Sequence, residues 1–441
     1  MHRSRGGGWR QGLVAAHASA LLLLPATALA GNTDPYYHSG DAALQAGAIT
    51  ADSRDGGAAW YNPAGLANLP EFRFDVSVSA FSLSFGGRPD LAATADSKTL
   101  RLTKPDLSIV PSAMTVTHHF GPVGVAFGVF APQQRVSLIR TQVTNTAANP
   151  EATGISIGLD ANLNVKEYAI GPSIGFRLHP RVDLGFSLFA NYRNEVSIIG
   201  LDASGQSGSR LTSHQTSDLK QFGLQPLLGV QLHPGHNYEL GFAVRLPSFE
   251  LFEQRQTVDV STTASNATIP EHTSQFAGSS KLGTATATPM RFHAGVSRRL
   301  GNSRLALEVN YQTPFRNSDS DWKAVVNLRL GGKHQLSQRY TIGGGLFSDR
   351  SPERGARSFG DVDLDYYGVT IAVDRGSLYA IAAENGRPVK HAREIRFGTT
   401  VALTYAIGLG KVVGVDSSLR EVPSSAVAHD LILHVSSSLM E

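Results

Sequence analysis

The chain has 441 residues, with 39 Lys and Arg against 36 Asp and Glu. Charged residues make up 17 % of it, below the roughly 25 % typical of soluble domains. Cys is absent, which excludes a disulfide framework and a thiolate metal site. Gly contributes 45 residues. Low charge with many glycines is unusual for a soluble secreted protein and suits strands that face lipid on one side.

The first thirty residues have the features of an export signal. Arg3, Arg5 and Arg10 precede an apolar run, and Ala28-Leu29-Ala30 is a small-x-small cleavage pattern. We therefore predict a secretory signal peptide over residues 1–30. It carries three of the basic residues and no acidic one, so the remainder balances at 36 against 36. The charge pattern gives no support to a nucleic-acid partner.

Residues 31–71 differ from the rest of the chain because they show no regular alternation. The stretch from Asp55 to Phe72 holds three glycines, two prolines and the adjacent aromatics Trp60 and Tyr61. Gly and Pro favour tight turns. We expect this part of the chain to form a compact unit separate from residues 72–441.

From residue 72 onward, apolar and polar residues alternate. Phe72, Phe74, Val76 and Val78 form the first apolar set, and a phase slip near Ala80 predicts a β-bulge. Further alternating segments begin near residues 123, 168, 182, 222, 238, 290, 305, 397 and 431. Long alternating segments separated by turns predict an all-β fold, a transmembrane antiparallel β-barrel over residues 72–441 with fourteen to sixteen strands. A soluble β-sandwich or propeller explains the alternation, but not segments of this length.

The links between these segments alternate in length. Short links, expected to be periplasmic turns, are 178–181, 232–237 and 300–303. Longer polar stretches, expected to be extracellular loops, are 140–162, 200–218 and 255–287. This rhythm is typical of outer-membrane barrels.

Motifs that could carry catalysis are weak. Ser173 lies in a G-x-S-x-G match, but a nucleophile elbow needs a strand, a sharp turn and a helix, whereas this motif falls inside an alternating segment. Adjacent His118 and His119 point to opposite faces of a strand and cannot share a metal ion. We therefore assign no catalytic residue, metal or cofactor, and expect a protein that is not an enzyme.

The N-terminal stretch resembles a known family. Gly40-Asp41-Ala42 and the run A-A-W-Y-N-P-A-G-L-A at 58–67 are similar to the N-terminal signature of the FadL family of outer-membrane long-chain fatty-acid and aromatic-hydrocarbon transporters. The resemblance implies that residues 31–71 form a small, partly helical hatch inside a barrel of about fourteen strands. The signature residues of this hatch are Trp60, Tyr61, Asn62, Pro63, Ala64, Gly65 and Leu66.

The resemblance also implies a route for a ligand. In this family a hydrophobic molecule is captured in apolar pockets, the hatch shifts, and the molecule leaves sideways beside a kinked third strand. Residues 121–134 are the candidate for that strand, and Pro132 cannot donate a ladder hydrogen bond. The candidate kink and lateral-gate residues are Pro122, Gly124, Gly128, Phe130 and Pro132.

Together these features predict passive uptake of hydrophobic small molecules, either long-chain fatty acids or aromatic hydrocarbons, by a monomer in the outer membrane of a Gram-negative bacterium. Its other expected partners are outer-membrane lipid, lipopolysaccharide and the barrel-assembly machinery. A general porin and, with Ser173 as nucleophile, a barrel-type lipid hydrolase are the alternatives. Outer-membrane barrels usually end on an aromatic residue, whereas this sequence ends at Glu441. Either residues 429–440 form the last strand, or residues 397–409 form it and a tail follows. We expect the first arrangement.

Overall fold

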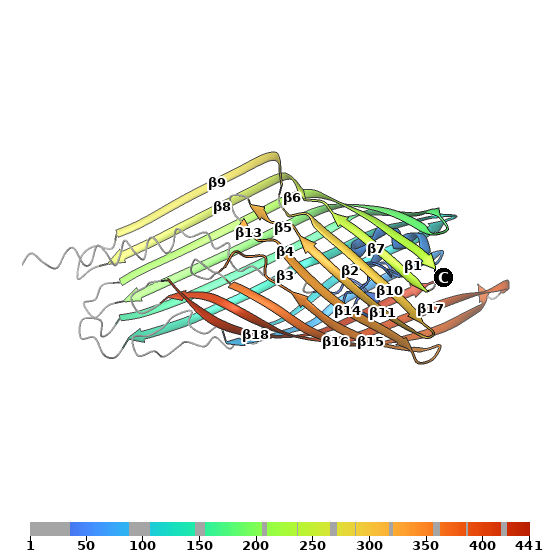
Figure 1. The fold of residues 1–441 in the computed structure, drawn as a ribbon. Coiled ribbons are helices and arrows are strands. Elements are labelled where there is room, and N and C mark those ends of the chain that lie inside the picture. Colours follow the sequence, from blue (N-terminus) through green and yellow to red (C-terminus); the bar gives the residue numbers. More distant parts are fainter. Residues whose placement is uncertain are drawn as a thin grey trace, which may run out of the picture.

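A computed structural model describes eleven stretches of the chain (Figure 1). They are residues 36–87, 106–145, 155–204, 210–235, 237–264, 271–286, 288–316, 321–355, 362–384, 387–415 and 421–441. The predicted signal peptide, residues 1–30, and the first five residues of the predicted hatch lie outside them. Within these ranges, no helix combines the length and apolar character needed to cross a bilayer.

The strands form one antiparallel sheet that closes on itself. Sixteen strands belong to it. Fourteen of them form a closed ring, because β5, at one end of the sheet, also pairs with β6, and β8 and β9 lie outside this ring. The ring strands are β1 (Phe72–Gly87), β2 (Asp106–Phe120), β3 (Val123–Asn145), β4 (Ile155–His179), β5 (Val182–Ser204), β6 (Arg210–Gly235), β7 (Tyr238–Arg245), β10 (Arg291–Leu300), β11 (Ser303–Gln312), β14 (Val325–Gln335), β15 (Tyr340–Asp349), β16 (Val362–Glu384), β17 (Arg387–Val415) and β18 (Glu421–Met440). The predicted all-β, closed antiparallel barrel is confirmed.

Two strands extend the sheet beyond the ring. β8 (Phe249–Ala264) continues β7 along the edge of β6, and β9 (Glu271–Thr286) pairs with β8. A small separate pair is formed by β12 (Phe315–Arg316) and β13 (Asp321–Trp322). In Figure 1, β3 to β6, β8 and β9 run far past the other strands at one end of the barrel.

The prediction of long loops at 140–162, 200–218 and 255–287 was wrong, because most of these residues lie in strands. Thr and Val along 255–264 favour extended structure, and antiparallel partners satisfy the backbone groups of this segment. These strands show no apolar–polar alternation because both of their faces are polar. In β9, for example, all side chains from 273 to 282 are exposed. Alternation identifies a strand only where its two faces meet different surroundings.

The apolar side of the alternating segments faces outward. Leu307 is 46 % exposed and Ile371 63 %, whereas the adjacent polar residues Glu308 and Thr370, on the inner face, are almost fully buried. This arrangement inverts that of a soluble protein, in which large apolar surfaces are covered. An apolar outer belt around a closed barrel is what a bilayer interior can solvate.

The short links form tight turns at one end of the barrel, which we call the short-turn end. Leu300 pairs with Ser303 and Gly235 with Tyr238 around two of them, as predicted. The bulge near Ala80 is confirmed by a register shift between Ser79 and Phe81.

β18 pairs with both β1 and β17 and so closes the ring, which confirms the predicted last strand, although it begins earlier, at Glu421. At the short-turn end, the β16–β17 hairpin continues past the barrel, where the two strands pair only with each other among the described residues.

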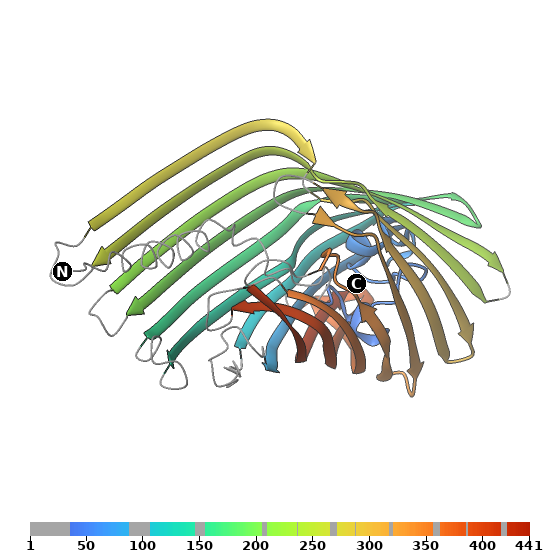
Figure 2. The ribbon, with the colours of Figure 1, turned by 60° about the vertical axis from the view of Figure 1, so that its left-hand side comes forward.

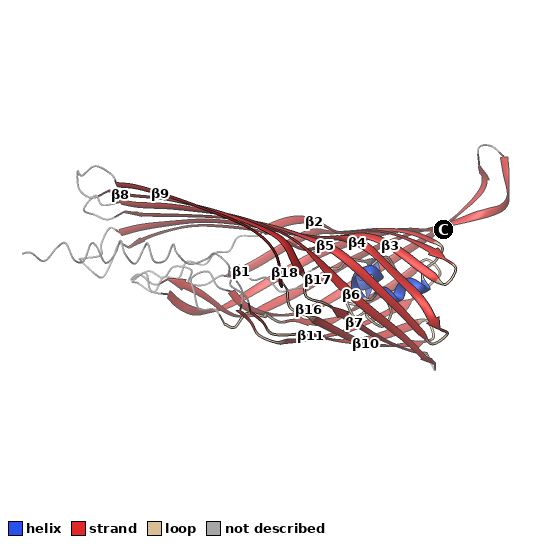
Figure 3. Cartoon of the chain, turned by 90° about the horizontal axis from the view of Figure 1, so that it is seen from above, coloured by secondary structure: helices blue, strands red, loops and turns tan. Residues whose placement is uncertain are grey.

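Residues 36–71, which we call the hatch segment, lie inside the ring (Figures 2 and 3). Two short helices, α2 (Gly40–Leu44) and α3 (Ala58–Tyr61), and the 3₁₀ helix η1 (Pro63–Asn68) make up its regular structure. α2 contacts β14 to β18, and η1 contacts β3 to β6 on the other side. The segment therefore spans the lumen from one wall to the opposite one, and its short helices are consistent with the predicted partly helical N-terminal piece.

Candidate functional site

The Asn-Pro-Ala part of the hatch signature fixes a turn and attaches it to the wall. The Asn62 side-chain oxygen accepts a hydrogen bond from the Ala64 N–H and so caps η1, while Pro63 occupies its first turn. The Asn62 Nδ2 group donates to the carbonyl oxygens of Thr50, at 2.7 Å, and of Val230 on β6, at 3.1 Å. One side chain therefore joins the hatch segment's own turn, an earlier loop and the barrel.

Glycines of the wall form the seat of the hatch segment. A Cβ atom added to Gly185 of β5 would lie 2.2 Å from the backbone of Pro63 and Ala64, and one on Gly241 of β7 would lie 2.1 Å from the Thr50 carbonyl oxygen. No side chain fits at such distances, so only Gly lets the two backbones approach. The candidate kink residue Gly124 belongs to this seat: its added Cβ would lie 2.1 Å from a hatch carbonyl oxygen.

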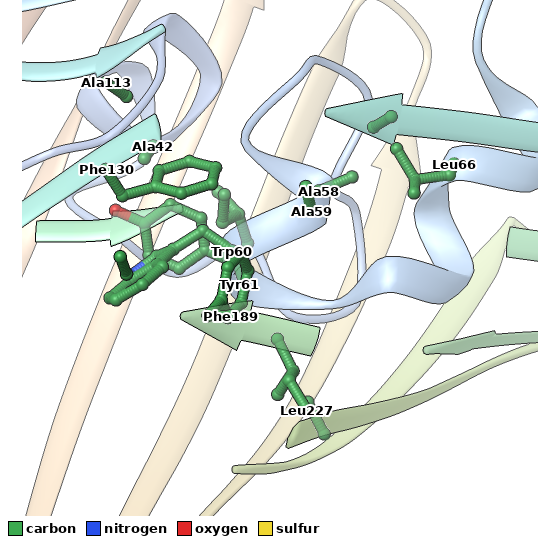
Figure 4. Packing of buried hydrophobic residues seen from close by; sticks show 14 of the residues in the cluster. Ala42, Ala58, Ala59, Trp60, Tyr61, Leu66, Ala113, Phe130, Phe189 and Leu227 are labelled. Carbon is green, nitrogen blue, oxygen red and sulfur yellow. The ribbon is translucent and has the colours of Figure 1, made fainter. Parts of the chain in front are cut away.

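An aromatic cluster joins the hatch segment to Phe130 of β3 and Phe189 of β5 (Figure 4). The Trp60 ring lies 4.9 Å from His38, 5.1 Å from Phe130 of β3 and 5.5 Å from Phe189 of β5, centroid to centroid. The Arg245 guanidinium of β7 lies 3.8 Å above the Trp60 ring and donates to the Trp60 carbonyl oxygen at 2.6 Å. Phe130 and Phe189 are completely buried. The cluster thus combines aromatic contacts with a cation–π contact in a dry environment.

β3 changes its pairing at Phe130. β2 and β3 pair from Phe120↔Val123 to Ala113↔Phe130, and beyond that point the described part of β3 pairs with β4 alone. The register with β4 also shifts there, so that Ala131 and Pro132 together lie opposite one residue. A bulge of this kind bends the strand. The irregularity falls within 121–134 and next to Trp60.

The other candidate residues of this strand lie elsewhere. Pro122 is in the β2–β3 turn, where its carbonyl oxygen accepts a hydrogen bond from the Arg177 N–H. Gly128 makes room for the ring of Phe130, because an added Cβ would lie 2.5 Å from it. The structure therefore brings Phe130 and Pro132 together at the bulge and places Pro122 at the short-turn end.

Ion pairs hold the hatch segment at the short-turn end. Asp52 bonds Arg304 of β11 and Arg54, and Asp41 of α2 accepts a hydrogen bond from Lys333 of β14 at 2.8 Å. Asp52 is fully buried, so its charge requires these partners. The hatch segment is thus tied by charges at one end and by aromatic rings next to the β3 bulge.

Asp55, in the loop between α2 and α3, is a titratable group close to this ionic contact. Its carboxyl oxygens accept hydrogen bonds from the N–H groups of Asp41, at 2.8 Å, and Gly57, at 3.0 Å. Burial, together with the charge of Asp41, raises the pKa of Asp55 to about 7. Burial opposes ionisation of Asp41 as well, but Lys333 outweighs it and keeps the pKa of Asp41 below its ordinary value.

The remaining sequence candidates do not form a reactive site. Ser173 lies within the continuous strand β4, beside Ala126 of β3 and Ser187 of β5, so the strand–turn–helix context of a nucleophile elbow is not formed there. His119 Nε2 contacts the Ala67 carbonyl oxygen at 3.2 Å, while His118 packs against Phe120. In the part of the chain that the structure describes, no three His, Asp or Glu side chains are grouped as metal ligands.

Sequence reasoning missed Phe189 and Arg245, the wall partners of Trp60. Arg245 follows the outward-facing Phe242 and Val244 on β7, so its position on the opposite face of the strand was a usable signal for a lumen-facing charge. Phe189 carried no such signal, because one buried Phe on a strand does not reveal which residue it contacts.

The fold and the site define a plugged β-barrel of the transmembrane type. It is similar to the crystal structure of a Pseudomonas aeruginosa FadL homologue, with a TM-score of 0.59 and 12 % identity over 93 % of this chain and 99 % of that one. It is also similar to the CymD monoaromatic hydrocarbon channel, with a TM-score of 0.58 and 10 % identity over 92 % of this chain and 97 % of that one. A third similar structure is the P. putida toluene transporter TodX, with a TM-score of 0.57 and 10 % identity over 92 % of this chain and 98 % of that one.

At these identities the likeness concerns the fold, and at that level the resemblance to FadL-type channels is confirmed. No protein-family model and no curated protein sequence matches the chain.

Proposed function

We propose that this protein is an outer-membrane channel for the passive uptake of hydrophobic small molecules, long-chain fatty acids or aromatic hydrocarbons. The observation that carries the proposal is the contact of Trp60, in the hatch segment, with Phe130 at the β3 bulge. Structures of the same fold include a monoaromatic hydrocarbon channel and a toluene transporter. An apolar ligand can be bound without a chemical reaction, because each methylene group that it buries contributes about 0.8 kcal/mol to the binding free energy.

The geometry supports a sideways exit. A ligand that displaces Trp60 from Phe130 loosens the hatch segment where β3 pairs with β4 alone. A straight path to the short-turn end would instead carry an apolar molecule past Asp52, Arg304 and their partners. Desolvating such charges is costly, so the lateral path beside Phe130 and Pro132 is the easier one.

The same features count against the alternatives. A general porin requires an open lumen, whereas Ala58, Ala59 and Leu66 of the hatch segment are completely buried inside the ring. A lipid hydrolase would require Ser173 in a reactive turn, and it lies in β4. The proposal includes a signal peptide, residues 1–30, that directs export to the outer membrane of a Gram-negative bacterium. There the protein is a monomer without a cofactor, and its partners are outer-membrane lipid, lipopolysaccharide and the barrel-assembly machinery.

Removing the β3 bulge tests the proposal. Deletion of Pro132 restores one-to-one pairing between β3 and β4. We expect the variant to take up labelled dodecanoate and ethylbenzene several-fold more slowly than the wild type, measured in a Gram-negative host that lacks its own long-chain fatty-acid channel. Deletion of Ala80, which removes the comparable bulge in β1, is the matched control and should leave uptake unchanged.

Two results would contradict the proposal. One is wild-type uptake no faster than in host cells without the protein, which would remove the transport function. The other is undiminished uptake by the Pro132 deletion, which would remove the lateral exit and leave transport standing.

A further inference from the structure

Arginines interrupt the apolar outer belt at two places, both at the short-turn end. The outward-facing residues of β10 are Phe292, Ala294, Val296, Arg298 and Leu300, and those along β16 are Tyr367, Val369, Ile371, Val373, Arg375 and Ser377. Arg298 and Arg375 thus each follow the apolar run of their strand, and both are exposed. Arg298 lies two residues before the end of β10, and Arg375 pairs with Tyr340, the first residue after the β14–β15 turn. The two arginines therefore lie at about the same level of the barrel.

No acidic residue shares this surface. It comprises the outward-facing positions of seven neighbouring strands, within 238–244 of β7, 292–300 of β10, 305–311 of β11, 326–336 of β14, 340–346 of β15, 367–377 of β16 and 397–409 of β17. Over these ranges the outward face carries no Asp, Glu or Lys, and its only arginines are Arg298 and Arg375. The carboxylates next to them, Glu239 and Asp374, point into the lumen, where each has a partner. The two positive charges are therefore uncompensated on the outer face.

A tyrosine stands beside each arginine on the neighbouring strand. The Arg298 guanidinium lies 5.0 Å from the centre of the Tyr238 ring, over its face, and Arg375 is paired in register with Tyr340. A cation–π contact orients a guanidinium against the ring. Among the described residues, no side chain or carbonyl group accepts a hydrogen bond from Arg298 or Arg375. The guanidinium of Arg298 is thus held along the outer wall, with its N–H donors left for whatever covers the wall at this level.

In a bilayer this level of the barrel meets the lipid headgroups. Transmembrane barrels place aromatic residues where the hydrocarbon ends, and Tyr238, Tyr340 and Phe397 are exposed there. Under the proposed function the short-turn end faces the periplasm, so these headgroups belong to the periplasmic leaflet. The anionic part of a phospholipid headgroup is its phosphate, and a guanidinium binds phosphate through paired charge-assisted hydrogen bonds.

We propose that Arg298 and Arg375 each bind the phosphate of an anionic phospholipid, such as phosphatidylglycerol, in the leaflet at the short-turn end. Two uncompensated guanidinium groups favour a headgroup with net negative charge over a zwitterionic one, whose ammonium group offsets its phosphate. The arginines are four strand spacings apart, about 19 Å at roughly 4.8 Å for each spacing, so they bind two separate lipids. The choice of the periplasmic leaflet rests on the proposed function, whereas the two contacts do not.

The test is native mass spectrometry of the full mature protein in detergent with added phosphatidylglycerol, phosphatidylcholine or glycerol phosphate, which has the charged group without acyl chains. The variants are Arg298→Gln, Arg375→Gln and the double variant. The control combines Arg299→Gln with Arg396→Gln, which removes two positive charges at the same end of the barrel but from the lumen side, where both residues line a cavity. All four side chains are exposed, so the barrel should fold unchanged.

We expect the wild type to retain about two phosphatidylglycerol molecules, each single variant about one and the double variant none, because each guanidinium supplies one bidentate contact. The control variant should retain the lipid as the wild type does. Phosphatidylcholine and glycerol phosphate should be retained several-fold less by the wild type, the first because its charges offset each other and the second because it has no acyl chain to lie against the apolar wall.

Three results would overturn the inference. The first is a double variant that retains as much phosphatidylglycerol as the wild type. The second is a control variant that loses as much of it as the double variant, since the effect would then come from net charge. The third is wild-type retention of phosphatidylcholine or glycerol phosphate equal to that of phosphatidylglycerol, which would mean that an anionic lipid is not what the arginines recognise.

An uptake measurement separates this inference from the proposed function. Neither arginine faces the lumen, so the double variant should take up labelled dodecanoate at the wild-type rate. If the wild type takes up no dodecanoate while lipid retention depends on the arginines, the lipid sites stand, and the channel function fails together with the leaflet that it assigns. If uptake is normal and lipid retention is indifferent to the arginines, only the lipid sites fail.

Discussion

Individual residues of the hatch segment carry opposite kinds of contact. Trp60 is held by aromatic rings and by the Arg245 guanidinium, whereas Asp52 and Asp41 are held by charges. Asp55 differs from both because its carboxyl group accepts only backbone hydrogen bonds. No ion pair therefore fixes the charge of the Asp55 carboxyl group.

Asp55 should make docking of the hatch segment dependent on pH. Its pKa is about 7 in the docked state, against about 3.9 for an Asp in water. Below about pH 4 both states are protonated, and above about pH 7 both are ionised. Between these values only the undocked state releases the proton, so docking weakens as pH rises and stays weakened above pH 7.

The measurement is the opening frequency in planar bilayers at pH 5 and pH 8. We expect more frequent openings of the wild type at pH 8 and no pH dependence in Asp55→Asn. Asp321→Asn changes a partly exposed carboxylate of β13 and should retain the wild-type difference. A pH response of Asp55→Asn as large as that of the wild type would exclude Asp55 as its origin.

At the scale of elements, strands with one apolar face were predictable and others were not. Apolar and polar residues alternate from Phe72 to Val78 of β1 because one face of the strand meets lipid and the other the lumen. The change of phase at Ala80 correctly predicted the bulge. β9 has solvent on both faces, so its residues carry no period. The signature around Asn62 predicted a hatch, but the wall partners of its Trp60 lie on strands β3, β5 and β7, and contacts across the lumen leave no local pattern in the sequence.

The glycine seat gives an element-level prediction. Gly185→Val should displace η1, because even a Cβ atom would lie 2.2 Å from the Pro63–Ala64 backbone, a distance at which that backbone must shift. We expect a lower midpoint of thermal unfolding and more frequent channel openings. Gly278→Ala in β9 is the control, since its added Cβ would meet only the Phe276 ring at 3.5 Å, an ordinary contact. Equal effects of the two substitutions would mean that the seat does not hold the hatch segment.

At the scale of the whole molecule, the barrel and its plug have separate sources of stability. Each of the fourteen ring strands pairs with a neighbour on both sides, and the outer belt is apolar. The hatch segment contributes no strand to that ring. Its polar seat, which includes Glu308 bonded to the Thr50 N–H at 2.8 Å, can be hydrated once the plug is gone. The barrel should therefore survive without it.

Deletion of residues 31–71 tests this separation. We expect a folded barrel whose ion conductance in planar bilayers exceeds that of the wild type about tenfold, because a ring this wide without its plug leaves an aqueous path. The control replaces residues 379–395, the projecting part of the β16–β17 hairpin, by an Asn-Gly turn. That change shortens the chain outside the lumen, since these strand residues pair only with each other among the described ones. Conductance that rises in the control as it does in the deletion, or in neither, would refute the assignment of residues 31–71 as the plug.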